Sequence, residues 1–184
     1  MIRIVAALGF ALVVTGCGAG VGASDTPEKT FEAVKGAAKR KDWKWILSAI
    51  HPDEREIGVL GGMMAAGAVS MNNDAAKKEL EEIRTRHGVG TPDSRSFADK
   101  AKMKGAAREA FKSVKDLPGL FAELVSFMDR HSKEKNPFRS SFEDGILKDV
   151  KIDGDRATAQ VETGKESNRI DFIRRDGLWY LALE

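Results

Sequence analysis

The spacing of apolar residues changes near Phe142, and this change constrains the fold more than any other feature of the sequence. Before that point, apolar residues recur every three or four positions, as on one face of an amphipathic helix. After it, they alternate with polar residues, which is the pattern of a strand with one buried face. A chain that is helical first and stranded last predicts an α+β fold, with N-terminal helices packed on a C-terminal antiparallel sheet.

Glycine-containing turns divide the last part of the chain, residues 142–184, into strands. The turns are Asp153-Gly154, Gly164-Lys165 and Asp176-Gly177, and dipeptides of this kind connect neighbouring antiparallel strands. We therefore expect a four-stranded meander with one apolar face, whereas Tyr180 alternates with the apolar set and should face away from it. That set consists of Ile146, Val150, Ile152, Ala157, Ala159, Val161, Ile170, Phe172, Trp179, Leu181 and Leu183.

Two short helices are predicted at the start of the folded body. Asp25 or Thr26 can cap the first, because both side chains accept hydrogen bonds from free backbone N–H groups, and Pro27 suits its first turn. The second should span residues 42–50 with Trp43 on its inward face, and it should end before the proline that follows. Together they are expected to form an αα-hairpin.

Residues 53–135 are predicted to be a helical insertion between this hairpin and the sheet. Its first part, residues 57–71, carries no charge, and Gly58 and Gly62 have the spacing that lets helices approach closely. As a helix this run would be only about 22 Å long, against a hydrocarbon core of about 30 Å in a bilayer. We therefore expect it to be buried inside the fold.

The rest of the insertion is expected to form further helices. One should run from residues 73–74 to His87, a longer one from Ser96 until Pro118-Gly119 interrupts it, and the last to about His131. Basic residues recur at every fourth position of the long helix. They predict either an ordinary solvated face or a ridge that faces anionic lipid headgroups, and they are Lys100, Lys104, Arg108 and Lys112.

The N-terminus has the features of a bacterial export signal. One positive charge, at Arg3, precedes an uncharged apolar run at residues 4–14 that is too short to span a bilayer. The run ends in Val14-Thr15-Gly16-Cys17, which resembles the lipobox of bacterial lipoproteins. The resemblance implies that residues 1–16 are removed as a signal peptide and that Cys17 carries a lipid anchor. The alternative is an ordinary cleavage site with a cysteine beside it by chance.

Cysteine usage and net charge fit a lipid-anchored body outside the cytoplasm. Cys17 is the only cysteine, so neither an intramolecular disulfide nor a multi-cysteine metal site can form. Loss of residues 1–16 removes Arg3 and no acidic residue, so the net charge falls from +2 to +1, and this near-neutral charge argues against nucleic-acid binding. Residues 17–24 would be the lipidated cysteine and a flexible tether, and residues 25–184 a single α+β domain.

The sequence contains no pattern typical of a catalytic, cofactor or metal site. His51, His87 and His131 lie far apart at expected helix ends, where the helix dipole favours a cation, and no pair has the spacing of a zinc site. The acidic pairs at residues 53–54 and 81–82 fall on charged stretches and should be solvated. We therefore expect no catalytic residue, no cofactor and no metal ion.

Two stretches resemble the NTF2-like domains (cystatin-like, SnoaL-related) of bacterial lipoproteins, including the DUF4878 type. One runs from Thr26-Pro27-Glu28 to Ile50-His51-Pro52, and the other from Val150-Lys151-Ile152-Asp153-Gly154 to Asp176-Gly177-Leu178-Trp179. The resemblance implies a curved sheet wrapped around helices, with an apolar cavity. The candidate residues for its core or for the pocket lining are Trp43, Ile170, Phe172 and Trp179. The helical insertion at 53–135 departs from the family's pattern.

These features together predict a membrane-anchored lipoprotein of the bacterial cell envelope, held by lipid on Cys17 to the inner or outer membrane and facing the extracytoplasmic or periplasmic side. Its body is expected to be a non-catalytic module that binds a small apolar ligand or an envelope protein. One alternative is an accessory or assembly lipoprotein that acts through its inserted helices. The other is an enzyme of isomerase or hydrolase type. The sequence does not specify the ligand or the oligomeric state.

Overall fold

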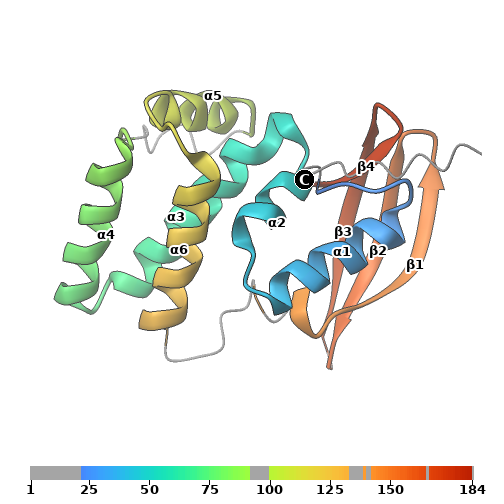
Figure 1. The fold of residues 1–184 in the computed structure, drawn as a ribbon, viewed down its shortest axis with the longest axis horizontal. Helices are drawn as coiled ribbons and strands as arrows, with labels where there is room; N and C mark the ends of the chain where they lie inside the picture. The colour runs from blue at the N-terminus through green and yellow to red at the C-terminus, as the bar shows by residue number, and fades with distance from the viewer. Residues whose placement is uncertain (1–21, 92–99, 133–138, 140–141, 165, 184) are drawn as a thin grey trace, which may run out of the picture.

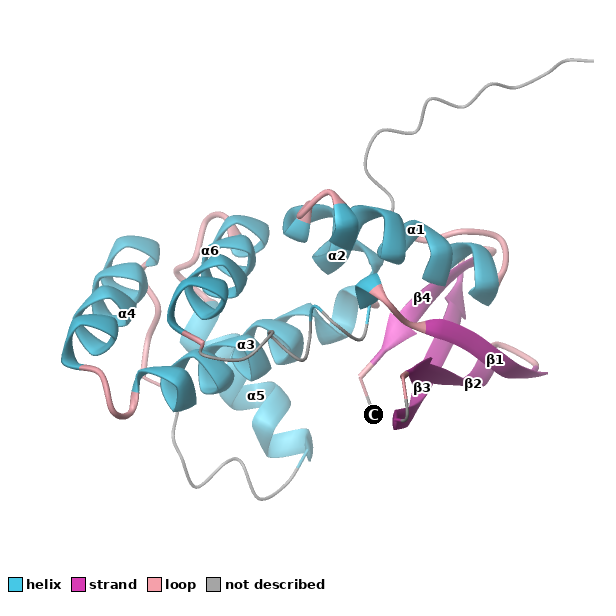
Figure 2. Ribbon diagram, turned by 90° about the horizontal axis from the view of Figure 1, so that it is seen from below, coloured by secondary structure: helices cyan, strands magenta, loops and turns pink. Residues whose placement is uncertain are grey.

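A computed structural model describes residues 22–91, 100–132, 139, 142–164 and 166–183. Within these ranges the chain forms six α-helices, one short 3-10 helix and a four-stranded sheet. The molecule is elongated, with the sheet and the first helix at one end, the inserted helices at the other and the second helix between them (Figure 1, Figure 2). The predicted α+β class is confirmed, and the arrangement is consistent with an NTF2-like one.

The first two helices form the predicted hairpin. α1 spans Pro27–Lys39 and α2 spans Trp43–Ala49. Thr26 caps α1, because its hydroxyl oxygen accepts a hydrogen bond from the backbone N–H of Lys29 at 3.2 Å. Asp42 caps α2 in the same way. Both helices therefore begin where local side chains satisfy their free N–H groups.

The described part of the insertion consists of helices joined by short loops. It contains the 3-10 helix η1 (Pro52–Glu54), α3 (Arg55–Ser70), α4 (Asp74–His87), α5 (Lys100–Phe111) and α6 (Leu117–His131). Asn73 caps α4, and Gly88 ends it with a positive φ of 69° that favours glycine. The sequence predicted both ends of α4.

The break between α5 and α6 lies earlier than the sequence predicts. α5 ends at Phe111, and Pro118-Gly119 lie in the first turn of α6 instead of interrupting a longer helix. Asp116 defines the start of α6, because its carboxylate accepts a hydrogen bond from the backbone N–H of Gly119 at 2.8 Å. A proline in the first turn of a helix removes an N–H group that would have no partner there. The predicted start at Ser96 lies outside the described residues.

The sheet is the predicted antiparallel meander, in the order β1-β2-β3-β4. Its strands are β1 (Ile146–Asp153), β2 (Arg156–Thr163), β3 (Glu166–Arg175) and β4 (Leu178–Ala182). The turn between β3 and β4 has positive φ at Asp176 (52°) and Gly177 (80°), as the two-residue turns that match strand twist require. α1 lies across one face of this sheet (Figure 1).

The edge strand β1 departs from the predicted alternation. Its pairing with β2 shifts between Lys148 and Lys151, and Asp149 has a positive φ of 52°, which together define a bulge with one extra residue. Before the bulge Leu147 packs against the core, and Ile146 is 56% exposed. The expected burial of Ile146 is therefore wrong, and so is that of Ile152, which is 57% exposed near the end of the strand.

The sequence predicts that Tyr180 faces solvent. This prediction is wrong, because Tyr180 is only 8% exposed. The imidazole of His51 packs against it edge-on, with ring centroids 5.9 Å apart. His51 also donates its backbone N–H to the carbonyl of Leu181 at 2.9 Å. The segment after α2 therefore covers the face of β4 that alternation assigns to solvent.

One buried hydroxyl group joins three segments of the fold. Thr30 on α1 is fully buried, and its hydroxyl donates a hydrogen bond to the carbonyl of Trp179 at 2.8 Å. The same oxygen accepts a hydrogen bond from the backbone N–H of Ser24 at 3.0 Å, and the carbonyl of Ser24 accepts one from the N–H of Trp179 at 2.7 Å. Thr30 therefore holds α1, β4 and the segment before α1 together.

Candidate functional site

Helix α3 has one buried face and one open face. Val59, Leu60 and Ala66 are buried, whereas Met64 is 52% exposed and Met71, which follows the helix, is 68% exposed. The expectation that residues 57–71 are buried as a whole is therefore wrong. Since glycine and alanine dominate the open face, the helix can remain uncharged on a surface without presenting a large apolar area.

A groove of about 470 Å³ lies between α3 and α6. This volume is within the range of about 300–1,000 Å³ that small-molecule sites occupy. Its described lining contains no ionisable side chain, and the Ser132 hydroxyl is the polar group among the side chains. The lining residues are Gly58, Gly61, Gly62, Ala65, Ala68 and Val69 from α3, Phe121, Val125, Met128 and Ser132 from α6 and the residue after it, and Ile50 and Leu183.

Small residues on α3 create this groove. A Cβ atom at Gly58 would lie 3.1 Å from Cδ1 of Ile50 and 3.2 Å from Cδ1 of Leu183, so glycine allows the close approach of these side chains. A Cβ at Gly62 would lie 3.8 Å from the ring of Phe121, whereas a Cβ at Gly61 would meet no atom of the described residues within 4 Å. The open space beside Gly61 is therefore part of the groove.

Polar contacts fix the end of the groove that Ile50 and Leu183 form. The carboxylate of Glu54 accepts a hydrogen bond from the backbone N–H of Leu183 at 2.7 Å. The guanidinium of Arg55 donates to the carbonyls of Ser48 at 2.8 Å and Ile50 at 3.2 Å. Glu54 is thus a structural group, and the expectation that it is merely solvated is wrong.

The residues expected from the family resemblance lie in the core and not around the groove. Trp43, Phe172 and Trp179 are 3%, 1% and 3% exposed, and Ile170 packs partly buried against them. Of the two roles expected for them, core or pocket lining, these residues have the first. Sequence reasoning missed the groove, although the repeat of small residues at every third or fourth position of α3 is a readable signal of a helix face.

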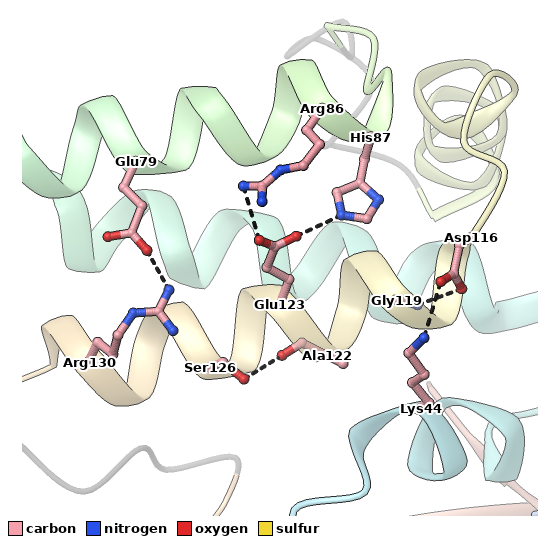
Figure 3. Close-up of polar contacts among 10 residues, drawn as sticks. All are labelled: Lys44, Glu79, Arg86, His87, Asp116, Gly119, Ala122, Glu123, Ser126 and Arg130. Carbon is pink, nitrogen blue, oxygen red and sulfur yellow. Dashed lines mark hydrogen bonds and ion pairs between the residues drawn. The ribbon is translucent and has the colours of Figure 1, made fainter.

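Two clusters of ionic contacts join α4 to α6 (Figure 3). Glu123 of α6 accepts a hydrogen bond from His87 at 2.7 Å and forms an ion pair with Arg86 at 3.0 Å. At the other end, Glu79 of α4 contacts both Arg130 and His131 of α6, the latter at 2.7 Å. Each carboxylate is therefore held by an adjacent arginine and histidine of the other helix.

These clusters come from a short sequence motif that occurs twice. Glu79 precedes Arg86-His87 by the same number of residues as Glu123 precedes Arg130-His131. The two helices are antiparallel, so each copy of the motif meets the other and the contacts are reciprocal. The hydrogen bond from His131 and the nearby charge of Arg130 hold the pKa of Glu79 below its usual value. The sequence predicted the histidines at the helix ends, but the repeat of this motif was not predicted.

A third ionic contact joins the hairpin to α6. Lys44 of α2 contacts the carboxylate of Asp116 at 3.2 Å. The backbone N–H of Gly119 and the ammonium of Lys44 lower the pKa of Asp116. The contact with Gly119 fixes the start of α6, and the contact with Lys44 holds that start beside α2.

The three histidines make contacts within the fold. His87 and His131 each donate a ring N–H to a glutamate, and His51 packs against Tyr180. In the described ranges, no group of three or more His, Cys, Asp or Glu side chains could hold a metal ion. No described helix is long and apolar enough to cross a membrane.

Two of the sequence predictions lie partly or wholly outside the described residues. Cys17 and the motif that resembles a lipobox precede residue 22, and the side chain of Lys100 is not described. Of the other basic residues, Arg108 and Lys112 are exposed, Lys104 is half-buried, and Lys112 pairs with Glu109 on the same turn. A role for this helix face at a membrane stays a prediction. No family model, curated protein or solved structure matches the chain.

Proposed function

We propose that the protein is a lipoprotein of the bacterial cell envelope, anchored by lipid on Cys17, whose body binds a small apolar ligand without catalysis. The α3–α6 groove is the observation that carries the binding function. Its described lining is apolar and has no acidic or basic side chain. An apolar ligand would gain there from removal of its surface from water, while the lining offers no general acid or base.

The anchor is supported by the apolar run at residues 4–14 and the Val14-Thr15-Gly16-Cys17 motif behind it. Intact-mass measurement of the protein expressed in bacteria should show loss of residues 1–16 and addition of acyl groups. The protein should enter the detergent phase in a phase-separation assay, and Cys17→Ser should leave it in water. Identical partition of the two proteins would rule out the lipid anchor.

Ligand binding can be tested by filling the groove from α3. Gly61 and Gly67 lie on the same helix, and a Cβ at either would meet nothing within 4 Å, but only Gly61 is among the groove residues. Both substitutions to leucine should favour the helix to the same small extent, about 1 kcal/mol each. Gly61→Leu and Gly67→Leu are therefore a matched pair.

The measurement is the fluorescence of N-phenyl-1-naphthylamine added to the soluble Cys17→Ser chain. We expect saturable binding, weakened at least tenfold by Gly61→Leu and unchanged by Gly67→Leu. Equal binding by all three proteins would place the probe elsewhere and remove the support for a groove function.

The exposed methionines of the insertion favour a second candidate function, an accessory or assembly lipoprotein that acts through these helices. Met64 and Met71 are large apolar side chains that are more than half exposed. A stoichiometric partner recovered from detergent-solubilised envelope, and lost with Met64→Lys but not with Gly61→Leu, would favour this function over ligand binding.

A further inference from the structure

The described start of the chain lies next to one end of the α3–α6 groove. Ser24 forms an antiparallel bridge with Trp179 of β4. Followed back toward the N-terminus, the chain therefore runs in the direction in which β4 leads to Leu183, a groove residue. Gly22 packs so closely on α2 that a Cβ there would overlap the backbone of Ala49, which precedes Ile50.

The length of chain before this point is short. Cys17 lies five residues before Gly22, and five residues reach at most about 17 Å. A lipid on Cys17 is therefore confined to the region around the end of the groove that Ile50, Gly58 and Leu183 form. Confinement by a tether of only five residues corresponds to an effective concentration in the millimolar range.

The groove has the dimensions and chemistry of a site for one acyl chain. From Gly58 to Val69 it follows eleven residue steps of α3, which is about 16 Å. One leaflet of a bilayer, and hence one extended acyl chain, is about 15 Å deep, half of the hydrocarbon core. The described lining has no charge that an acyl chain would have to desolvate.

We infer that the α3–α6 groove holds one of the acyl chains attached to Cys17. This inference rests on the proposed lipid anchor. It also gives the groove a role in anchoring, because stable attachment to a bilayer takes two inserted chains and one alone is marginal. Withdrawal of one chain into the groove would leave fewer chains in the membrane, so the fold would weaken its own attachment.

The single cysteine of the sequence makes a direct test possible. Once Cys17 is lipidated, a cysteine introduced by Ala65→Cys in the groove is the chain's one free thiol, and Gly67→Cys on the same helix is its control outside the groove. Both proteins are prepared lipidated in phospholipid vesicles and as soluble Cys17→Ser chains with and without the same vesicles. The rate of reaction with a water-soluble maleimide is measured.

We expect the thiol at position 65 to react at least tenfold more slowly in the lipidated protein than in the soluble chain, with or without vesicles. The thiol at position 67 should react equally in all three. Metabolic labelling with a diazirine fatty acid, followed by irradiation, should then join the Cys17 lipopeptide to a peptide of α3 or α6 in the same molecule.

Three other results would overturn the inference, each in a different way. Equal reaction at position 65 in lipidated and soluble chains, with the lipid mass present, means that the groove is open and leaves the proposed ligand binding intact. Slow reaction of the soluble chain when vesicles are added means that membrane lipids fill or cover the groove. Absence of the lipid mass removes the anchor itself, and with it the proposed lipoprotein function.

Discussion

The buried hydroxyl of Thr30 should contribute more to stability than its small size suggests. Thr30→Val keeps the shape of the side chain but removes the donor to the Trp179 carbonyl and the acceptor for the Ser24 N–H. A buried polar group without a partner costs about 1–3 kcal/mol. The Trp179 carbonyl is buried, whereas the Ser24 contact is only partly buried, so we expect a total loss of about 2–3 kcal/mol.

Thr30→Ser is the control, since it keeps the hydroxyl and removes one methyl group. Its expected cost is about 1 kcal/mol, the value of one buried carbon. Urea unfolding of the soluble Cys17→Ser chain, followed by tryptophan fluorescence, measures both. With a dependence of about 1–3 kcal/mol per molar urea, Thr30→Val should lower the midpoint by about 0.7–3 M. If valine proves as stable as serine at this position, the hydrogen bonds do not join these segments as argued.

Three further outcomes are expected. Trp179→Ala should cost about 3–5 kcal/mol in urea unfolding, because it truncates a buried aromatic side chain, and a loss below 1 kcal/mol would contradict its place in the core. Leu147→Lys should destabilise the protein strongly and Ile146→Lys by no more than about 0.5 kcal/mol, and the reverse order would contradict the bulge in β1. Folding lowers the pKa of Glu79 from its unfolded-state value of 4.5. The contact of Glu79 with His131 therefore stabilises the fold above pH 4.5, and this stabilisation is lost as the pH falls through the folded-state pKa. Glu79→Gln should therefore cost about 1 kcal/mol at neutral pH, as for a partly exposed ionic contact, and progressively less as the pH falls below 4.5. A cost that does not change with pH would exclude the charge as the cause.

The elements of the fold that depend on neighbouring residues could be predicted from the sequence. Alternation and the Asp176-Gly177 turn define the meander, because side-chain direction and positive φ are properties of a few consecutive residues. Caps such as Asn73 and the stop at Gly88 define α4 for the same reason. The resemblance of residues 14–17 to a lipobox is equally local, and the lipid anchor that it implies stays a prediction.

The features that depend on distant segments were decided by tertiary structure. Tyr180 is buried because His51, far away in the sequence, packs on its ring. Alternation along β1 could not show the bulge at Asp149, because a bulge is defined by pairing with β2. A local pattern fails at such positions because a partner from elsewhere determines the outcome.

The candidate groove combines both kinds of information. The sequence showed that residues 57–71 are uncharged and rich in glycine, but it could not show which face of that helix would remain open. The packing of α6 and Leu183 against α3 decides this, since no atom of the described residues fills the space beside Gly61. The paired motifs around Glu79 and Glu123 are also present in the sequence, yet only the antiparallel packing of α4 on α6 brings them together. The periodicity of apolar residues determines which face of a helix can be buried, and the packing of neighbouring elements determines which face is buried.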